Sequence, residues 1–179
     1  MRIITGKYRS RLLLSPKCIR PTQNKVRKAV FDILGDVNGL SFLELFAGSG
    51  AVGFEALSRG ASGVVLVEEN REAQTAINGN IQALKVENCL LIPGKAESAL
   101  PFLQKSGRKF DVLFMDPPYN KDLAKKILQI LGACDILAPN AFVIVQHFKN
   151  DALDEEAVGL HLIKKAKYGD TLLSFYQKE

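Results

Sequence analysis

The chain alternates short apolar runs with segments in which apolar residues recur every three or four positions. Such runs are typical of buried strands, and the wider spacing is typical of helices that bury one face. The predicted strands cover residues 40–46, 63–68, 90–92, 110–116 and 141–146. The predicted helices cover residues 51–58, 71–84, 97–103 and 121–132, one after each of the first four strands. This order predicts an α/β fold, a mostly parallel sheet with helices on both faces.

Both ends of the chain depart from this alternation. Residues 160–163 and 171–176 flank the turn-like Tyr168-Gly169-Asp170, which predicts an antiparallel hairpin at the C-terminal end. Before the first strand, apolar residues at helical spacing predict one helix: Val26, Ala29, Val30, Ile33 and Leu34. The segment before that helix interleaves apolar and basic residues, which predicts a hairpin with Gly6 at or near its turn. We therefore expect an N-terminal extension, residues 1–35, and one larger domain, residues 36–179.

Charge is unevenly distributed along the chain. The net charge is +5, yet the first 28 residues hold nine basic residues and no acid, which leaves 15 basic and 19 acidic residues in the rest. A basic end on an acidic body indicates a nucleic-acid contact surface, although a solvated face is the simpler alternative. The candidate RNA contacts are Arg2, Lys7, Arg9, Arg11, Arg20 and Arg27.

Several function classes are disfavoured by composition. No apolar run approaches the roughly 18 residues of a membrane span, and the first residues lack the apolar core of a secretory signal. The three cysteines form no CxxC pair, and there are only two histidines. Neither a disulfide framework nor a metal site is indicated, and a reducing compartment fits. We expect a cytoplasmic protein with no membrane contact and no metal.

A glycine-rich turn follows the first predicted strand. Gly48, Gly50 and Gly53 satisfy the pattern G-x-G-x-x-G, and Glu68 ends the next strand twenty residues after Gly48. This is the fingerprint of nucleotide cofactor sites, in which an acid binds the ribose hydroxyls. Small residues for tight packing of a helix on a sheet are the alternative. The turn alone fits NAD as well as S-adenosylmethionine (SAM).

Asp116-Pro117-Pro118-Tyr119, at the end of the strand 110–116, favours SAM. The prolines fix the backbone, so a carboxylate, free carbonyls and an aromatic ring are held in one geometry, although a plain turn is possible. The Asp116 carboxylate and Pro117 carbonyl would hold both hydrogens of an amine, turning its lone pair toward a sulfonium methyl. Such positioning lowers a barrier by at most ~7–11 kcal/mol. Hydride transfer needs none of these groups. Glu44, before the glycines, suits a ligand with an ammonium group.

These motifs resemble the class I SAM-dependent amino-methyltransferases. Further motifs, spread over the full length, are similar to the RsmD family: Met1 to Gly6, Arg20-Pro21-Thr22 with Arg27, Leu57 to Ala61, and Tyr176-Gln177. That family methylates N2 of a guanine in bacterial small-subunit (16S) ribosomal RNA. The resemblance implies a Rossmann-like sheet of seven strands with an antiparallel last hairpin, and an N-terminal extension that helps to hold RNA.

The resemblance also implies roles for individual residues. The residues expected to wrap the methionine part of SAM are Phe46, Ala47, Gly48, Ser49 and Gly50. Glu68 would bind the ribose, the Ala96 amide the adenine ring, and residues Asp116 to Tyr119 a flipped guanine. Lys95 and Gln146 depart from the family pattern, in which acids are common at both positions.

The partner implied is ribosomal RNA or an assembling small subunit, bound by a monomer. An adenine-N6 methyltransferase acting on RNA or DNA remains the alternative within this class. An NAD-dependent oxidoreductase would use the glycine turn but not Asp116 to Tyr119. A non-catalytic RNA-binding module would use only the basic end.

Overall fold

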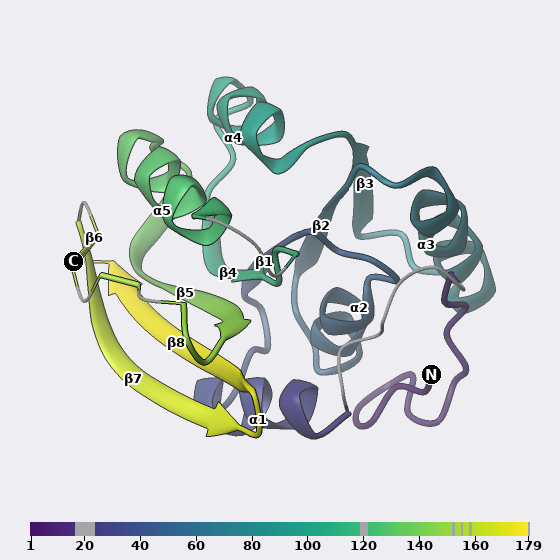
Figure 1. Ribbon diagram of the computed structural model, residues 1–179. Coiled ribbons are helices and arrows are strands. Elements are labelled where there is room, and N and C mark those ends of the chain that lie inside the picture. The colour runs from purple at the N-terminus through teal and green to yellow at the C-terminus, as the bar shows by residue number, and fades with distance from the viewer. Residues whose placement is uncertain (17–23, 119–121, 152, 155, 158, 179) are drawn as a thin grey trace.

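The computed structural model describes residues 1–16, 24–118, 122–151, 153–154, 156–157 and 159–178 (Figure 1). Its elements are α1 (Asn24–Leu34), β1 (Ser41–Leu45), α2 (Ala51–Ser58), β2 (Gly63–Glu68), α3 (Arg71–Leu84), β3 (Cys89–Pro93), α4 (Ala96–Lys105), β4 (Phe110–Met115), α5 (Leu123–Ala133), β5 (Leu137–Phe148), β6 (Glu156–Ala157), β7 (Leu160–Tyr168) and β8 (Thr171–Lys178). The predicted alternation of strands and helices is confirmed.

One sheet runs through the molecule in the order β3-β2-β1-β4-β5-β8-β7-β6. The strands β3, β2, β1, β4 and β5 are parallel, whereas β8 pairs antiparallel with both β5 and β7. The seven predicted strands and the C-terminal hairpin are therefore confirmed. The added β6 pairs with β7 over two residues at the sheet edge, which is too short to leave a pattern in the sequence.

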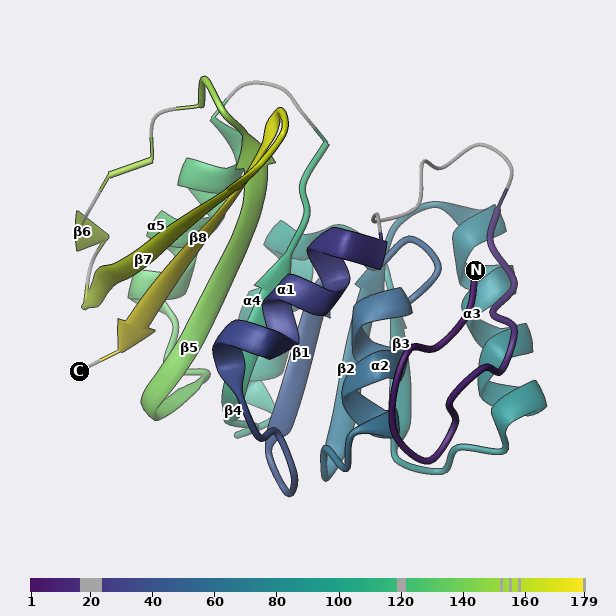
Figure 2. The ribbon, with the colours of Figure 1, turned by 90° about the horizontal axis from the view of Figure 1, so that it is seen from below.

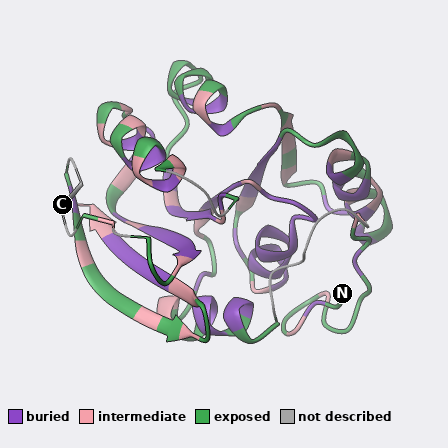
Figure 3. Cartoon of the chain, in the orientation of Figure 1, coloured by how far each residue is buried: buried purple, intermediate pink, exposed green. Residues whose placement is uncertain are grey.

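The helices cover the sheet on two sides (Figures 1 and 2). Buried residues of α1, α2 and α3 form one apolar cluster with one face of the sheet, and those of α4 and α5 form a second cluster on the other face. Figure 3 shows the central strands buried between these layers. Neighbouring residues such as Phe42 and Leu43 belong to opposite clusters, and both are 0% exposed. Because both faces are covered, the central strands appear in the sequence as continuous apolar runs.

Strand β5 begins earlier than the pattern predicts. The sequence indicates a start at Ala141, but the strand runs from Leu137. Pro139 and Asn140 interrupt the apolar run, and Asn140 has a positive φ of 60°. The pairing with β4 shifts register between Phe110 and Val112, which accommodates this irregularity.

The N-terminal segment, residues 1–16, folds back on itself without forming strands, so the predicted hairpin is only partly right. Arg2 and Leu12 form a single antiparallel bridge, and the Ile3 N–H donates to the Arg11 carbonyl. Gly6 lies in the turn with φ 83°, and a Cβ there would meet the Ser58 carbonyl of α2. The segment is thus held mainly by its contact with α2 rather than by its own ladder.

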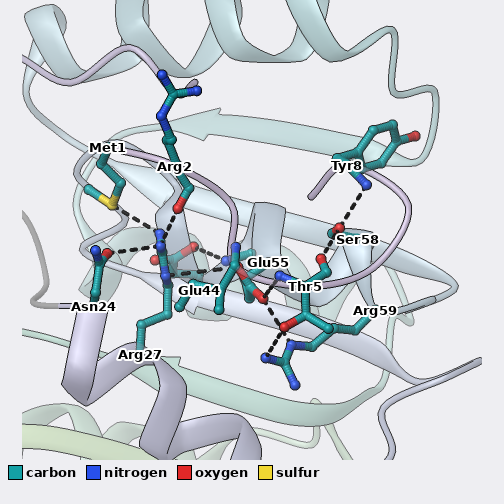
Figure 4. Close-up of polar contacts among 12 residues, drawn as sticks. Met1, Arg2, Thr5, Tyr8, Asn24, Arg27, Glu44, Glu55, Ser58 and Arg59 are labelled. Carbon is teal, nitrogen blue, oxygen red and sulfur yellow. Dashed lines mark hydrogen bonds and ion pairs between the residues drawn. The ribbon is translucent and has the colours of Figure 1, made fainter. Parts of the chain in front are cut away.

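The carboxylate of Glu55 on α2 makes that contact. It accepts hydrogen bonds from the backbone N–H groups of Ile4 at 2.7 Å and Thr5 at 3.0 Å (Figure 4). Its charge is balanced by Arg59 at 3.0 Å and by Arg27 of α1 at 3.9 Å. Glu55 and Arg27 are both 0% exposed. A buried charge pair of this kind is costly to break, because removing one partner leaves the other uncompensated.

This arrangement corrects one expectation. Arg27 was predicted to contact RNA, but its guanidinium is buried and donates to Asn24 Oδ1 and to the carbonyl of Arg2. Burial lowers the pKa of Arg27 below its ordinary value, and Glu55 opposes that shift. Arg27 therefore fastens the N-terminal segment to the core and does not present its charge to a nucleic acid.

Replacing Glu55 by alanine is expected to lower the free energy of unfolding by about 3–5 kcal/mol, because Arg27 loses its buried counter-charge. Urea unfolding measures the change. The control is Asp32→Ala, which removes the exposed Lys28–Asp32 pair and is expected to cost less than about 0.5 kcal/mol. Equal losses in the two variants would contradict the assignment.

Candidate functional site

The turn between β1 and α2 lies at the carboxyl edge of the sheet, where the neighbours of β1 are β2 and β4. The helix that follows β1, α2, covers one face of the sheet, and the helix that follows β4, α5, covers the other. The direction in which successive strands are added to the sheet reverses between β1 and β4. Ligands of open parallel sheets bind at such a point. The turn carries the residues predicted to wrap SAM, Phe46 to Gly50.

The glycines of this turn have two different tasks. Gly48 and Gly50 have φ of 56° and 71°, and Phe46 also has a positive φ of 57°. A Cβ on Gly50 would come within 2.8 Å of Phe54 and 2.9 Å of Leu66. Gly53 has no positive φ, but a Cβ there would come within 2.6 Å of Leu66. The first two glycines shape the loop, whereas Gly53 permits α2 to pack tightly on the sheet.

Glu68 ends β2 beside this turn, as predicted. It is buried, and its Oε2 accepts from the Gly48 N–H at 2.7 Å while its Oε1 accepts from the Asn70 N–H at 2.8 Å. A carboxylate here can also accept from two adjacent hydroxyls, such as those of a ribose. The structure therefore brings Glu68 and the glycine turn together at hydrogen-bonding distance.

A pocket of about 100 Å³ adjoins the turn, and it is lined by Phe46, Val67, Glu69, Gly94, Lys95, Ala96, Glu97 and Leu123. Ala96 begins α4, and Lys95 caps that helix without a side-chain hydrogen bond. Backbone N–H groups at a helix start suit the ring nitrogens of a purine. Glu69 also lines the pocket, although the sequence pointed only to Glu68.

Glu44 lies on β1 beneath the start of α2. It is buried, and its Oε2 accepts from the Gly53 N–H at 2.7 Å. Burial raises the pKa of Glu44 to about 8, and the charge of Asp116 adds to the shift. Near pH 7 its carboxyl group is therefore largely protonated, which weakens it as the partner of an ammonium group until such a ligand draws off the proton.

Asp116 directly follows β4, next to β1 at the same edge. Its side chain is half-buried, Pro117 is buried and Pro118 is exposed. The charge of Asp116 raises the pKa of Glu44, so Asp116 lies near the glycine turn that follows β1. Tyr119, the fourth member of the predicted set, lies outside the described residues.

One buried residue that sequence reasoning missed joins the site to the N-terminal segment. Asn80 of α3 is 1% exposed. Its Oδ1 accepts from the Leu14 N–H at 2.7 Å, and its Nδ2 donates to the carbonyls of Leu14 and Ser49 at 3.1 and 3.2 Å. A polar residue within the apolar stripe of the helix predicted over 71–84 was the available signal.

The structure places the residues that were predicted to contact RNA in different environments. Arg2, Lys7, Arg9 and Arg11 are exposed on the N-terminal segment, which lies beside α2 and α3 (Figure 2). Arg20 falls outside the described residues, and Arg27 is buried, as above. Four basic side chains therefore lie on one exposed segment, and this segment is bound to α2, the helix that follows the glycine turn.

The chain matches known proteins over nearly its whole length. Residues 1–177 match the family model described as Conserved hypothetical protein 95. The ribosomal RNA small subunit methyltransferase D of Escherichia coli (strain K12) is 32% identical over 182 residues, covering 100% of this chain and 90% of that protein. This chain belongs to the RsmD family of class I methyltransferases.

Structural similarity agrees with the family. The solved structure of the E. coli protein yhhF has a TM-score of 0.89 and 32% identity, and the match covers 100% of this chain and 98% of that one. SMU.776, in complex with S-adenosylhomocysteine, shares the fold with a TM-score of 0.70 at 17% identity, and the match covers 89% of this chain and 50% of that one. The predicted Rossmann-like fold and the dependence on SAM are confirmed, which excludes the NAD-dependent oxidoreductase.

The residues described by the structure contain no helix long and apolar enough to cross a membrane. Within the same ranges, no three histidines, cysteines or acids are grouped closely enough to hold a metal ion.

The raised pKa of Glu44 predicts a pH dependence of stability. An ordinary glutamate has a pKa of 4.5. From about pH 5 to 8, Glu44 in the folded protein therefore keeps a proton that it has lost in the unfolded chain. Unfolding then releases a proton, and the free energy of unfolding falls as the pH rises, by up to about 1.4 kcal/mol per pH unit. Glu44→Gln cannot ionise and is expected to flatten this slope in urea titrations. The exposed Glu87→Gln is the control, and a wild-type slope in Glu44→Gln would contradict the assignment.

Proposed function

We propose that this protein transfers a methyl group from SAM to the N2 amine of a guanine in small-subunit ribosomal RNA. One observation carries the proposal. Asp116-Pro117 follows β4 at the sheet edge where β1 leads into the glycine turn, so an amine held there would face the cofactor. The name of the E. coli relative, a small subunit ribosomal RNA methyltransferase, supports the substrate class.

The residues of the turn fit SAM on structural grounds. Gly50 lets the turn pack closely on Phe54 and Leu66, Glu68 offers a carboxylate for ribose hydroxyls, and Phe46 and Ala96 line a small pocket for the adenine. When bound, SAM supplies an electrophilic methyl group on a positive sulfur. No oxyanion develops in the transfer, so the site needs no oxyanion hole.

Asp116 and Pro117 orient the amine. The N2 lone pair of guanine is delocalised into the ring, which makes the nitrogen a weak nucleophile. The Asp116 carboxylate and the Pro117 carbonyl each accept one amine hydrogen, and the lone pair then points at the methyl group. The nitrogen forms the new bond to carbon as the electrons of the broken carbon–sulfur bond pass to sulfur, and the Asp116 carboxylate is placed to take the released proton. Tyr119 stacks on the base in this proposal.

The exposed cations of the N-terminal segment bind the RNA backbone. A guanine must leave its stack to reach the site, at a cost of a few kcal/mol that is least in loops and single strands. Contacts from Arg2, Lys7, Arg9 and Arg11 to phosphates offset that cost, and they make affinity depend strongly on salt. In this division of tasks, residues 1–35 hold RNA and residues 36–179 carry out the transfer. The protein would act as a cytoplasmic monomer on free ribosomal RNA or an assembling subunit.

Labelled SAM and small ribosomal subunits from a strain that lacks the activity test the proposal. Nucleoside analysis after digestion is expected to show the label in N2-methylguanosine. Label in N6-methyladenosine would establish the alternative reaction on adenine. Absence of label in both naked RNA and subunits, with SAM still bound, would contradict the proposal.

Asp116→Ala is expected to lower the turnover number by about 10²-fold or more, because the amine loses its acceptor. Isothermal titration is expected to show nearly unchanged SAM affinity. The control Asp135→Ala removes an exposed carboxylate that pairs with Lys109, the residue before β4. Methylation at the wild-type rate by Asp116→Ala would remove Asp116 from the mechanism.

Charge reversal of the N-terminal segment separates RNA binding from cofactor binding. The double variant Arg9→Glu/Arg11→Glu is expected to weaken RNA binding by at least tenfold at about 0.1 M salt and to reduce its salt dependence, with SAM affinity unchanged. The control Lys105→Glu/Arg108→Glu makes the same charge change on two exposed residues, one at the end of α4 and one in the loop before β4. Equal loss of RNA affinity in both double variants would show only the effect of net charge.

A further inference from the structure

Gln146 has an unusual environment for a polar residue. It lies near the carboxyl end of β5 and is only 5% exposed. Its Oε1 is buried and accepts no hydrogen bond from the residues that the structure describes. A buried amide oxygen without a donor costs free energy, and the few such groups in folded proteins often mark places where a ligand supplies the partner.

The sheet places Gln146 beside Asp116. Met115 of β4 pairs with Val145 of β5 in parallel register, so Asp116 and Gln146 are the next residues on adjacent chains. Side chains alternate along a strand, and Ile144 belongs to the apolar cluster formed with α1 and α2. Gln146 therefore projects toward the same face of the sheet as Ile144.

Asp116 is turned toward this same face. Glu44 lies there, because its carboxylate accepts from the Gly53 N–H of α2. Asp116 is close enough to Glu44 to influence its ionisation. The carboxylate of Asp116 and the amide of Gln146 thus lie on one side of the sheet edge, on neighbouring strands.

Guanine and adenine, the two candidate bases, differ in the ring nitrogens next to the amine that would be methylated. In guanine two ring nitrogens flank the N2 amine, and one of them, N1, carries a hydrogen whereas N3 carries a lone pair. In adenine the ring nitrogen next to the N6 amine carries a lone pair instead. If Asp116 and Pro117 accept the two amine hydrogens, the remaining donor on that edge of guanine is N1–H. A buried acceptor beside Asp116 matches guanine, whereas it would oppose the lone pair of adenine.

We propose that Gln146 determines the choice of base by accepting the N1–H of the target guanine through Oε1. The inference rests on the proposed function and adds a reason for its guanine specificity. The site then holds three donors on one edge of the base with three acceptors, two from the residues that follow β4 and one from β5. An analogue that cannot match a buried hydrogen-bonding group is rejected far more strongly than one that differs only in apolar bulk.

Gln146→Met tests the role of the amide, since it keeps the length of the side chain and removes its polar atoms. With small subunits from the strain lacking the activity, kcat/KM for RNA is expected to fall about 10- to 100-fold. The Kd for SAM is expected to stay unchanged, and the melting temperature to stay level or rise, because an unpaired buried oxygen has been removed. The matched control is Gln104→Met on α4, where the amide oxygen accepts from the Asp135 N–H.

Gln146→Glu tests which end of the amide matters, because a carboxylate supplies acceptor oxygens and no amide donor. It is expected to retain more N2-methylguanosine formation than Gln146→Met. The inference is overturned if Gln146→Met methylates guanine as fast as the wild type does, if its activity falls only in step with its melting temperature, or if Gln146→Glu is as poor as Gln146→Met. A wild-type protein that forms no N2-methylguanosine would instead overturn the proposed function itself.

Discussion

The buried carboxylate of Glu55 is the interaction on which the arrangement of the molecule depends. It binds the backbone of the N-terminal segment through Ile4 and Thr5 and is neutralised by Arg27 and Arg59. These partners come from the N-terminal segment, α1 and α2. A short basic segment with one antiparallel bridge would not hold a fixed shape alone, so this charge gives it a defined position against the domain.

Helix α2 connects the N-terminal segment to the proposed cofactor site. It begins directly after the glycine turn, its Gly53 N–H donates to Glu44, and Glu55 lies on its next turn. Asn80 adds a second connection, since it binds the backbone of both Leu14 and Ser49. The surface proposed for RNA and the turn proposed for SAM are therefore built on the same rigid elements. Sites supported in this way hold their geometry more exactly than sites on isolated loops.

Most of the fold could be predicted from the sequence because its strands are buried on both faces. Continuous apolar runs mark such strands, and the helices between them show clear stripes. The start of β5 could not be read, because Pro139 and Asn140 break the run within the strand. The burial of Arg27 was also missed, although it lies four residues before the buried Phe31 on the same side of α1. Its charge suggested a surface position, whereas its partner Glu55 is distant in sequence.

The residues of the site could likewise be predicted only in part. Local motifs gave the glycine turn, Glu68 and Asp116, because each follows directly from a strand end. Asn80 binds the backbone of Leu14 and Ser49, which lie far from it in the sequence, so no local pattern reveals these partners. Gln146 departs from the family pattern in the sequence, but only the fold shows that its amide oxygen is buried. The spacing rule selects only Glu68 at the end of β2, whereas it is the next residue, Glu69, that lines the small pocket.

The central claim is that one edge of the sheet, at the ends of β1, β2 and β4, holds the cofactor against the residues that grip the base. A crystal structure with S-adenosylhomocysteine tests it most directly. The account predicts the homocysteine part along Phe46 to Gly50, the ribose hydroxyls on Glu68, the adenine beside Ala96 and the sulfur facing Asp116. Binding elsewhere, such as at the opposite ends of the strands near Ser41 and Phe110, would contradict it.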